Sequence, residues 1–232
     1  AFHFKEKVDD SCGKWLDGKH LNRYLLTDGD EWLKYGDWLG APREPRYFEL
    51  PRLLFREIPG QNKRIQAVYT DQKSYYGHSI TPFLLQNSEY NIFFVLSVVN
   101  SKLISWYASQ KCSNFSKKTF PKLNPKDIKE FPIKITSIEH QMPFIDKANF
   151  MLSLNKEIQE VSRKFKRTFE RKFDLADLPK KLQDWYLLSY AEFIKELAKK
   201  KIKLSLSEEA EWEEYFNQES KKALDLKKQI DK

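Results

Sequence analysis

The feature that most constrains the fold is a stripe of apolar residues that recurs at three- and four-residue steps between positions 145 and 169. Such spacing places the side chains on one face of a helix, and it predicts a single α-helix from about 137 to 173. At 1.5 Å per residue this helix would be about 50 Å long. Thr136 and Glu139 have the spacing of a capping box at its start, and Pro143 predicts a kink. The stripe consists of Ile145, Ala148, Met151, Leu154, Ile158, Val161, Phe165 and Phe169.

The residues before this helix carry strand patterns. Residues 47–58 (YFELPRLLFREI) alternate and are rich in large apolar side chains, and a PGQNK turn separates them from RIQAVYT at 64–70. Turn residues between two such runs predict a pair of antiparallel strands joined by a loop.

The most apolar segment, residues 89–110, repeats its large side chains at helical steps, which predicts one buried helix. Leu103, Trp106 and Tyr107 are expected to pack inside the domain. Residues 111–135 contain three prolines and many lysines, so they predict an irregular basic loop that ends in a short strand, EFPIKI.

Two further helices are predicted near the C-terminus, one from about 178 to 201 and one from a Ser207 cap to the end. The second has Glu208 and Glu209 in its first turn and lysines in its last, as the helix dipole favours. The expected fold class is α/β of the α+β type, with a mixed, mostly antiparallel twisted sheet and packed helices, a long spacer helix and a small helical bundle. The predicted boundaries are 1–135, 136–173 and 174–232.

Positive charge is concentrated in one part of the chain. The 232 residues have 41 Lys and Arg against 33 Asp and Glu, a net charge of +8. Residues 43–134 hold 15 of the basic and 7 of the acidic residues, so the whole excess lies there. Clustered lysines are typical of a surface that contacts phosphates, although a solvated basic face would show the same clustering.

The sequence lacks the patterns of the common catalytic sites. It has no glycine-rich phosphate loop, no histidines or cysteines at metal-ligand spacing and no G-x-S-x-G element. LNPKD at 123–127 is similar to the N-P-P-[YF] element of amino-methyltransferases, but it lacks the second proline and the aromatic residue. These absences favour binding over catalysis, with no cofactor or metal bound by this part.

Cysteine content and hydropathy point to the cytoplasm. Cys12 and Cys112 are too few for a disulfide framework and suit a reducing compartment. The longest apolar run, at 91–99, is shorter than a membrane span, so no membrane partner is expected. The chain begins at Ala1 rather than a methionine, and it is expected to be part of a longer polypeptide.

Four elements occur in an order that resembles a known family. They are GKHLNRY at 18–24, FELPRLLFREI at 48–58, NIFFVLSVVNSKLISWYASQKC at 91–112 and LNPKDIKEFPI at 123–133. Together they resemble the C-terminal specificity domain of TaqI-type DNA methyltransferases. That domain is similar to the target-recognition domains of type IIG restriction-modification enzymes and, more distantly, to type I specificity subunits. Arg52 and Val99 are mild departures, where the family more often has lysine and leucine.

The resemblance implies that residues 1–135 are a DNA target-recognition domain for double-stranded DNA. An adenine-specific amino-methyltransferase domain that uses S-adenosylmethionine would lie upstream in the same polypeptide, and restriction forms carry a Mg²⁺-dependent nuclease domain further upstream. The long helix would act as a ruler between the specificity and catalytic domains. Alternatively, its stripe is buried within its own domain.

Two groups of residues are the candidates for contacts with DNA. Lysines set the register on the phosphates, whereas arginines and amides have the donors and acceptors that read base edges. The phosphate candidates are Lys63, Lys111, Lys117, Lys118 and Lys122, and the base-reading candidates are Arg43, Arg46, Gln61, Asn62, Arg64, Gln66 and Asn114.

Other conspicuous side chains have structural alternatives. Arg52 and Arg56 are two strand periods apart and would project to one side, either toward DNA or into salt bridges with Glu49 or Glu57. The remaining expectations are structural roles: core positions for Phe115 and Phe120, packing for Trp15, Trp32 and Trp38, and bonds to local backbone groups for Asn100 and Ser101.

Competing functions follow from the same residues. The stripe helix and the C-terminal bundle would also suit a helical protein–protein interaction module of a multi-subunit assembly, and the chain could be a type I specificity subunit. An unrecognised nuclease is a third possibility. Its motif would be an acidic residue followed by E-x-K, and the segment that comes near it, EYFNQESK at 214–221, lies on a predicted amphipathic helix.

Overall fold

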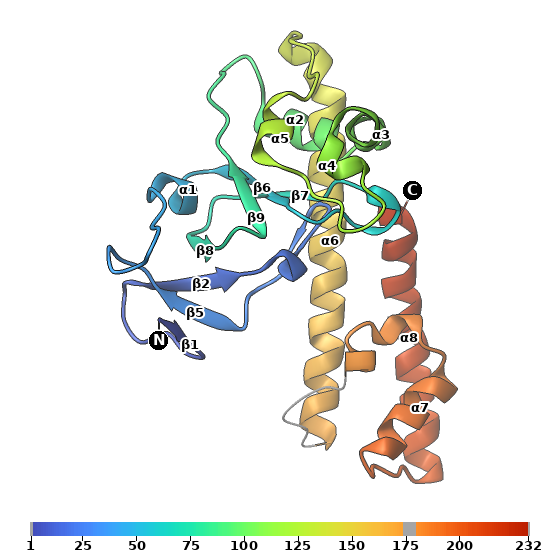
Figure 1. Ribbon diagram of the computed structural model, residues 1–232. Helices are drawn as coiled ribbons and strands as arrows, with labels where there is room; N and C mark the ends of the chain where they lie inside the picture. The colour runs from blue at the N-terminus through green and yellow to red at the C-terminus, as the bar shows by residue number, and fades with distance from the viewer. Residues whose placement is uncertain (1, 174–179, 232) are drawn as a thin grey trace. The chain divides into compact units, whose positions relative to one another are not determined.

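The computed structural model describes residues 2–173 and 180–231. The chain divides into two compact units, Ala1–Phe150 and Met151–Lys232. Unit 1 contains the strands and several short helices, and unit 2 is helical (Figure 1). The predicted α+β class is therefore confirmed.

The described residues of unit 1 form three small sheets rather than one. All strand pairs are antiparallel except β2 with β8, which confirms the mixed, mostly antiparallel character. The first sheet has the order β1 (His3–Phe4), β5 (Glu31–Lys34), β2 (Cys12–Leu16), β8 (Ser74–Tyr76); the second pairs β3 (Leu21–Asn22) with β4 (Leu25–Leu26); the third has the order β7 (Ala67–Thr70), β6 (Arg52–Arg56), β9 (Ile80–Phe83).

Strand β6, the middle strand of its sheet, lies in the hydrophobic core of unit 1. Its residues Leu53, Leu54 and Phe55 are at most 1% exposed, and a continuous apolar run of this kind is typical of a strand covered on both faces. Leu53 pairs with Tyr69 of β7, so the predicted strand pair is confirmed. The first strand is shorter than predicted because the short helix α1 (Arg46–Glu49) occupies its beginning.

The predicted helix over 89–110 is broken into two. Helix α2 (Ile92–Val99) packs against β6 and β7, and α3 (Lys102–Lys111) leaves it at an angle of 64°. The break lies at Asn100 and Ser101: the Ser101 hydroxyl accepts a hydrogen bond from the Ile104 amide and so caps a new helix. In the described residues no single helix is long and apolar enough to cross a membrane, and only this bent pair meets the length and composition together.

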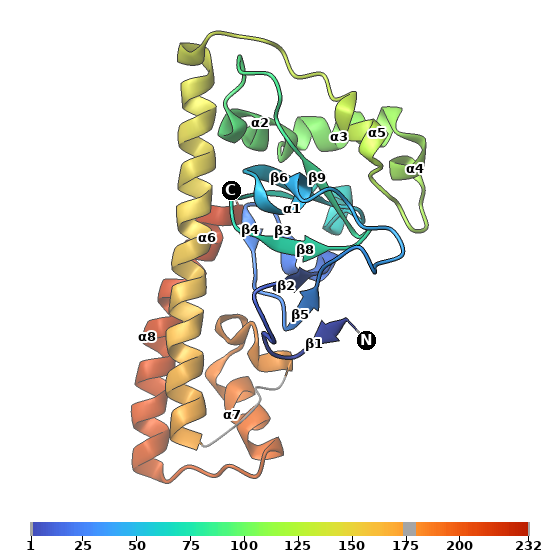
Figure 2. The ribbon, with the colours of Figure 1, turned by 90° about the vertical axis from the view of Figure 1, so that its left-hand side faces the viewer.

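After α3 the chain forms two short helices, α4 (Ser113–Ser116) and α5 (Pro125–Lys129). Figure 2 shows α2 to α5 in a row beside the sheet that contains β6 and β9. The predicted strand EFPIKI is wrong, since residues 131–137 have no regular structure. The Ile133 amide bonds back to the Phe131 carbonyl, a tight turn around Pro132 that an extended strand cannot contain.

Helix α6 (Ile138–Phe173) confirms the long helix, and it continues through Pro143. The predicted capping box is wrong by one residue, because Glu139 bonds to Ser137 and not to Thr136, and this bond lowers the pKa of Glu139. The buried Gln141 fixes the start of the helix through bonds from its Nε2 to the carbonyls of Glu89 and Thr136, at 2.7 and 2.9 Å.

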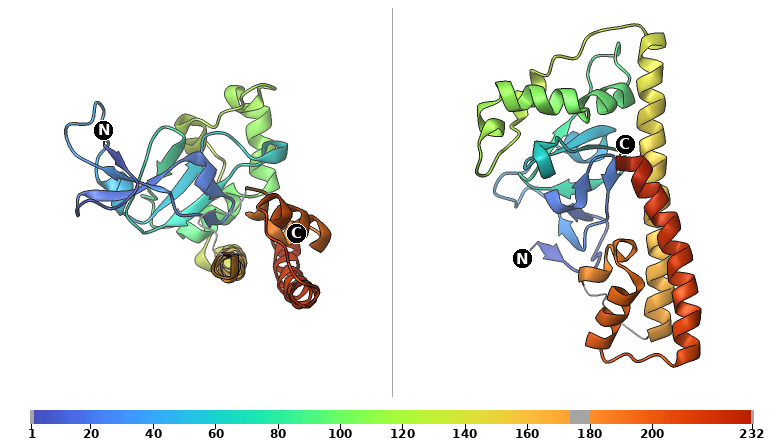
Figure 3. Two further views of the ribbon diagram at one scale, coloured as in Figure 1. Left: turned by 90° about the horizontal axis from the view of Figure 1, so that it is seen from below. Right: turned by 90° about the vertical axis from the view of Figure 1, so that its right-hand side faces the viewer.

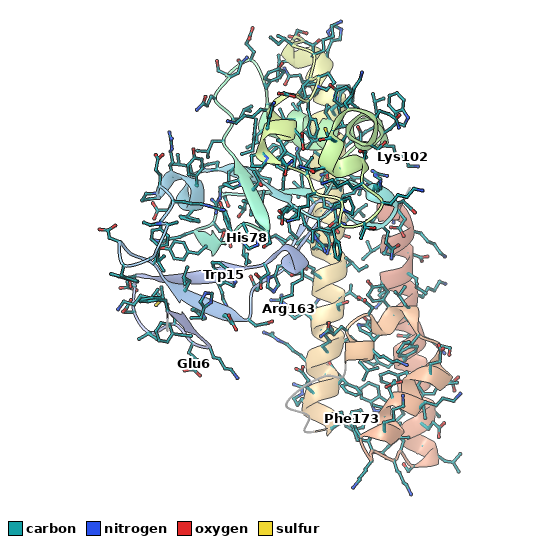
Figure 4. The ribbon with its side chains drawn as sticks, in the orientation of Figure 1. Glu6, Trp15, His78, Lys102, Arg163 and Phe173 are labelled. Atoms are coloured by element: carbon teal, nitrogen blue, oxygen red, sulfur yellow. The ribbon has the colours of Figure 1, made fainter. Side chains whose placement is uncertain are left out.

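The helices of unit 2 are drawn as ribbons in Figure 3, and they enclose aromatic side chains (Figure 4). Phe165 stacks on Trp185 with a ring-centroid distance of 3.6 Å, and Phe169, Phe193 and Phe216 complete a buried cluster. The end of the α6 stripe is therefore core. The other described elements of this unit are η3 (Lys180–Leu182), η4 (Trp185–Leu187), α7 (Tyr190–Lys199) and α8 (Leu206–Asp231).

The predicted helix limits in unit 2 need correction. In place of one helix over 178–201, the described residues form two 3₁₀ turns and then α7, which begins only after Ser189 caps it in a box with Glu192. Residues 178 and 179 lie outside the described residues. Helix α8 starts after Ser205, whose hydroxyl accepts the Glu208 amide, so the predicted Ser207 cap is two residues late.

Candidate nucleic-acid interface

Two loops of unit 1 lie against one another and carry several of the predicted contact residues. The first is the 3₁₀ turn η2 (Gln61–Lys63) between β6 and β7, and the second is residues 113–122. Lys63 Nζ donates to the Ser116 carbonyl at 2.7 Å, and the Leu123 amide donates to the Glu57 carbonyl at 2.8 Å. We call the predicted residues on these loops the basic loop cluster: Gln61, Asn62, Lys63, Asn114, Lys117, Lys118 and Lys122.

The second loop is anchored at both ends by apolar side chains. Phe115 is completely buried and Leu123 is 1% exposed. Between them Phe120 has a φ of 50° and is 77% exposed, which corrects its expected core position, whereas that of Phe115 is confirmed. A left-handed backbone is uncommon for non-glycine residues, and Asn62 and Lys63 on the first loop adopt it as well, at 55° and 52°. Local turns therefore shape both loops.

Charge on the cluster is largely uncompensated. Lys117 and Lys118 are exposed, and neither makes an ion pair with any residue that the structure describes. Lys122 is the exception, because its Nζ lies 2.9 Å from Glu57 Oε1. Lys111, at the end of α3, is also exposed and adds to the positive surface beside α4.

Arg43 and Arg46 belong to a different group of residues. Arg46 forms a salt bridge with Glu44 at 2.9 Å, and Arg43 lies near Tyr76, with Nη1 3.4 Å from its carbonyl oxygen. Both arginines line a groove of about 920 Å³, which Phe83 and the other residues of the 81–87 segment line as well. Their assignment as base readers stays a prediction.

Arg64 and Gln66 make bonds inside the unit. Arg64 Nη2 donates to the Asn100 carbonyl at 2.7 Å, and Gln66 Oε1 accepts from Arg56 Nη1 at 3.1 Å. Burial, and next to it the charge of Arg23, lowers the pKa of Arg64. Neither bond tests a role in base reading, but both occupy part of the side chain's hydrogen-bonding capacity.

The expectation for Arg52 is wrong in both of its forms. The side chain is fully buried, so it projects neither to DNA nor to a carboxylate. Its guanidinium donates to neutral oxygens: the Leu50 and Gln72 carbonyls and the hydroxyls of Tyr76 and Ser74. The two expected partners are paired elsewhere, Glu49 with Lys73 and Glu57 with Lys122.

Helix α3 exposes residues that were expected inside. Leu103 and Trp106 are 68% and 61% exposed, whereas Ile104 and Ala108 face the core. Lys102 shares the exposed side (Figure 4). Lys102 and Gln110 carried a signal for this orientation, since helical spacing places both on the side of the helix that bears Leu103 and Trp106. Of the three tryptophans expected to pack, Trp15 and Trp32 are partly buried, and Trp38 is half exposed.

The sequence comparisons match the residues that build this surface. A family model described as TaqI-like C-terminal specificity domain matches residues 13–133. The chain belongs to this family. A second model, a domain of unknown function (DUF8810), matches residues 137–232. No curated protein matches the chain.

Membership of the TaqI-like specificity family supports DNA target recognition in a restriction-modification context. Both loops of the basic loop cluster lie within the matched range. No group of three or more potential metal-binding side chains occurs in residues 2–173 or 180–231. The lysines and amides of the basic loop cluster are side chains suited to contacts with a polyanion.

Asn100 and Ser101, between α2 and α3, have structural roles. As expected, Ser101 bonds locally. Asn100 reaches further than expected: its Oδ1 accepts the Ala67 amide at 3.0 Å, and its Nδ2 donates to the Ala67 carbonyl at 2.9 Å. Asn100 therefore joins the end of α2 to strand β7, beside the first loop of the cluster.

Proposed function

We propose that this chain reads a short sequence of double-stranded DNA as the specificity part of a type IIG-like restriction-modification enzyme. The observation that carries the proposal is the pair Lys117 and Lys118, exposed and unpaired among the described residues, on a loop tethered beside Gln61–Lys63 within the family range. Uncompensated lysines beside amide side chains supply phosphate contacts and base readers together.

The catalytic steps belong to other parts of the proposed enzyme. An upstream domain of the same polypeptide would bind S-adenosylmethionine and methylate an adenine flipped out of the duplex. A nuclease domain, where present, would require Mg²⁺, and the enzyme would act in the cytoplasm. The family resemblance supports this arrangement, and in it residues 1–135 contribute recognition and α6 sets the distance to the catalytic domain.

Selection from a random duplex library tests the recognition. We expect one short consensus, with an affinity that falls steeply as salt increases, because each phosphate contact contributes about −0.9 to the slope of log K against log salt. Lys117→Glu with Lys118→Glu should lower that slope by about two and weaken binding to all duplexes alike.

A control with the same change of charge is Lys221→Glu with Lys222→Glu, an exposed lysine pair on α8 in which Lys222 forms an ion pair with Glu219. This variant should bind with nearly the affinity of the wild type. Binding that is indifferent to both sequence and salt would overturn the proposal. Equal losses in the two double variants would show only a general effect of net charge.

A protein–protein interaction module is the second candidate, and the separate helical core of unit 2 favours it. Phe165 is 2% exposed at the centre of that core, so Phe165→Asp should unfold unit 2. If DNA binding persists in Phe165→Asp and is weakened in the Lys117 and Lys118 variant, DNA recognition belongs to unit 1. The reverse pattern identifies unit 2 as the functional surface.

A further inference from the structure

Two arginines of unit 1 meet beside Tyr24, although they are 41 positions apart in the sequence. The Tyr24 amide donates to the Ala67 carbonyl at 3.0 Å, and that carbonyl also accepts Asn100 Nδ2. The Asn100 carbonyl in turn accepts Arg64 Nη2. The guanidinium carbon of Arg23 lies 5.9 Å from the centre of the Tyr24 ring. The turn at 23–24 and the residues before β7 thus bring the two cations close enough for the charge of Arg23 to act on Arg64.

The two guanidinium groups lack the partners that buried cations usually have. The Nε atoms of both Arg23 and Arg64 are buried without a hydrogen-bond partner. Among residues 2–173 and 180–231, no carboxylate forms an ion pair with either of them. Buried polar groups are nearly always satisfied, so two orphaned donors on adjacent cations need an explanation.

The electrostatics of the pair point the same way. The pKa of Arg64 is lowered first by burial and then by the charge of Arg23, so the two side chains repel one another in the folded chain. Both residues are only partly buried, although their Nε atoms are not exposed. Lys63 immediately precedes Arg64 in the chain and connects this pair to the basic loop cluster.

We propose that Arg23 and Arg64 together bind a phosphate group. Guanidinium groups match the geometry of phosphate oxygens, and one anion between two cations would remove their repulsion. Either a phosphodiester of the DNA backbone or free phosphate supplies this chemistry. Only the DNA source rests on the proposed function, and the anion site stands without it. Arg64, considered above as a base reader, is then a phosphate contact.

Arg64 has a structural alternative, which makes Arg23 the better test. A cation at the C-terminal end of α2 interacts favourably with the helix dipole, so Arg64 could serve folding alone. Arg23 makes no hydrogen bond with any described residue through its side chain. Arg23→Gln should therefore leave the melting temperature unchanged or raise it, because it removes repulsion, while phosphate binding is lost.

The DNA experiment measures duplex affinity for the wild type, Arg23→Gln and the control Arg163→Gln, an exposed arginine of α6 (Figure 4). We expect Arg23→Gln to weaken binding about tenfold, the value of one charge-assisted hydrogen bond, and to lower the salt slope by about one. The sequence preference should not change, because a phosphate carries no base identity.

The second experiment uses inorganic phosphate as the probe and potassium chloride of equal ionic strength as the reference. Phosphate should raise the melting temperature of the wild type and not of Arg23→Gln, since a ligand stabilises only the state that binds it. This shift without an effect on DNA affinity would identify free phosphate as the ligand. If Arg23→Gln behaves like the wild type in both experiments, the proposed phosphate site is wrong. A wild type that binds no duplex selectively would refute the proposed function, and the phosphate experiment would still decide the site.

Discussion

Replacement of Asn100 by alanine is the sharpest test of how unit 1 is held together. Asn100 is 2% exposed and makes two hydrogen bonds to Ala67, at 3.0 and 2.9 Å. The Ala67 carbonyl keeps a second donor, the Tyr24 amide, but no other described group accepts the Ala67 amide. Leaving this amide unsatisfied should cost about 1–3 kcal/mol, and the second lost bond about 1 kcal/mol. Asn100→Ala should therefore lower the free energy of unfolding of unit 1 by about 2–4 kcal/mol.

Hydrogen exchange in increasing urea separates the stability of peptides from residues 1–150 from that of peptides from 151–232. With an m-value of about 2 kcal/mol/M, the midpoint of unit 1 should fall by about 1–2 M. Asn149→Ala is the matched control, because Asn149 is exposed on α6 and should change the midpoint little. A loss below about 0.5 kcal/mol in Asn100→Ala, or an equal loss in the control, would refute the role assigned to the Asn100–Ala67 bonds.

Two further predictions concern titratable side chains of unit 1. Burial, together with the nearby Asp127, raises the pKa of Cys112 from 9.0 to about 11, so its thiol should react with iodoacetamide at pH 8 far more slowly than the thiols of the urea-unfolded chain. The folded chain holds the Cys112 proton more tightly than the unfolded chain does. The contribution of Cys112 to the free energy of unfolding is therefore complete below pH 9 and is lost as pH rises toward 11. A Cys112→Ala variant should lack this loss. Burial lowers the pKa of His20 below 6.5, and its Nδ1 accepts the Asp17 amide at 2.9 Å. The contribution of neutral His20 to the free energy of unfolding is complete above pH 6.5 and decreases as pH falls through the folded pKa. Urea midpoints measured from pH 7.5 to 5 should therefore fall less in His20→Gln than in the wild type. Equal pH dependence in both proteins would contradict this.

Local patterns in the sequence predicted the elements whose cause is local. The apolar run of β6 and the turn after it identified the strand pair, and the stripe over 145–169 identified α6. The break between α2 and α3 was missed because apolar periodicity reveals neither the Ser101 cap nor the bonds of Asn100 to a strand 33 positions earlier. The partners of Arg52 come mostly from residues 72–76, so the assumption of a nearby carboxylate failed for the same reason.

Part of the candidate site was likewise predictable from local sequence, and part depends on the fold. Clustered lysines without acids indicated the loop of Lys117 and Lys118 directly, because net charge is a property of composition. Arg23 carried no such signal: it becomes conspicuous only because the fold lets its charge act on Arg64 while no described carboxylate forms an ion pair with it. Which of the amides and arginines read bases depends on the docked duplex and stays a prediction.

Apart from the ion pair of Lys122 with Glu57, two bonds that hold residues 116–122 use main-chain atoms of that segment. Lys63 donates to the carbonyl of Ser116, and the amide of Lys122 donates to the carbonyl of Asn114 at 3.2 Å. Almost any residue supplies these groups, while the buried side chains of Phe115 and Leu123 stand outside the segment. The amino-acid sequence of this segment can therefore change, or be replaced by that of a homologue, while the backbone that presents its side chains keeps its conformation.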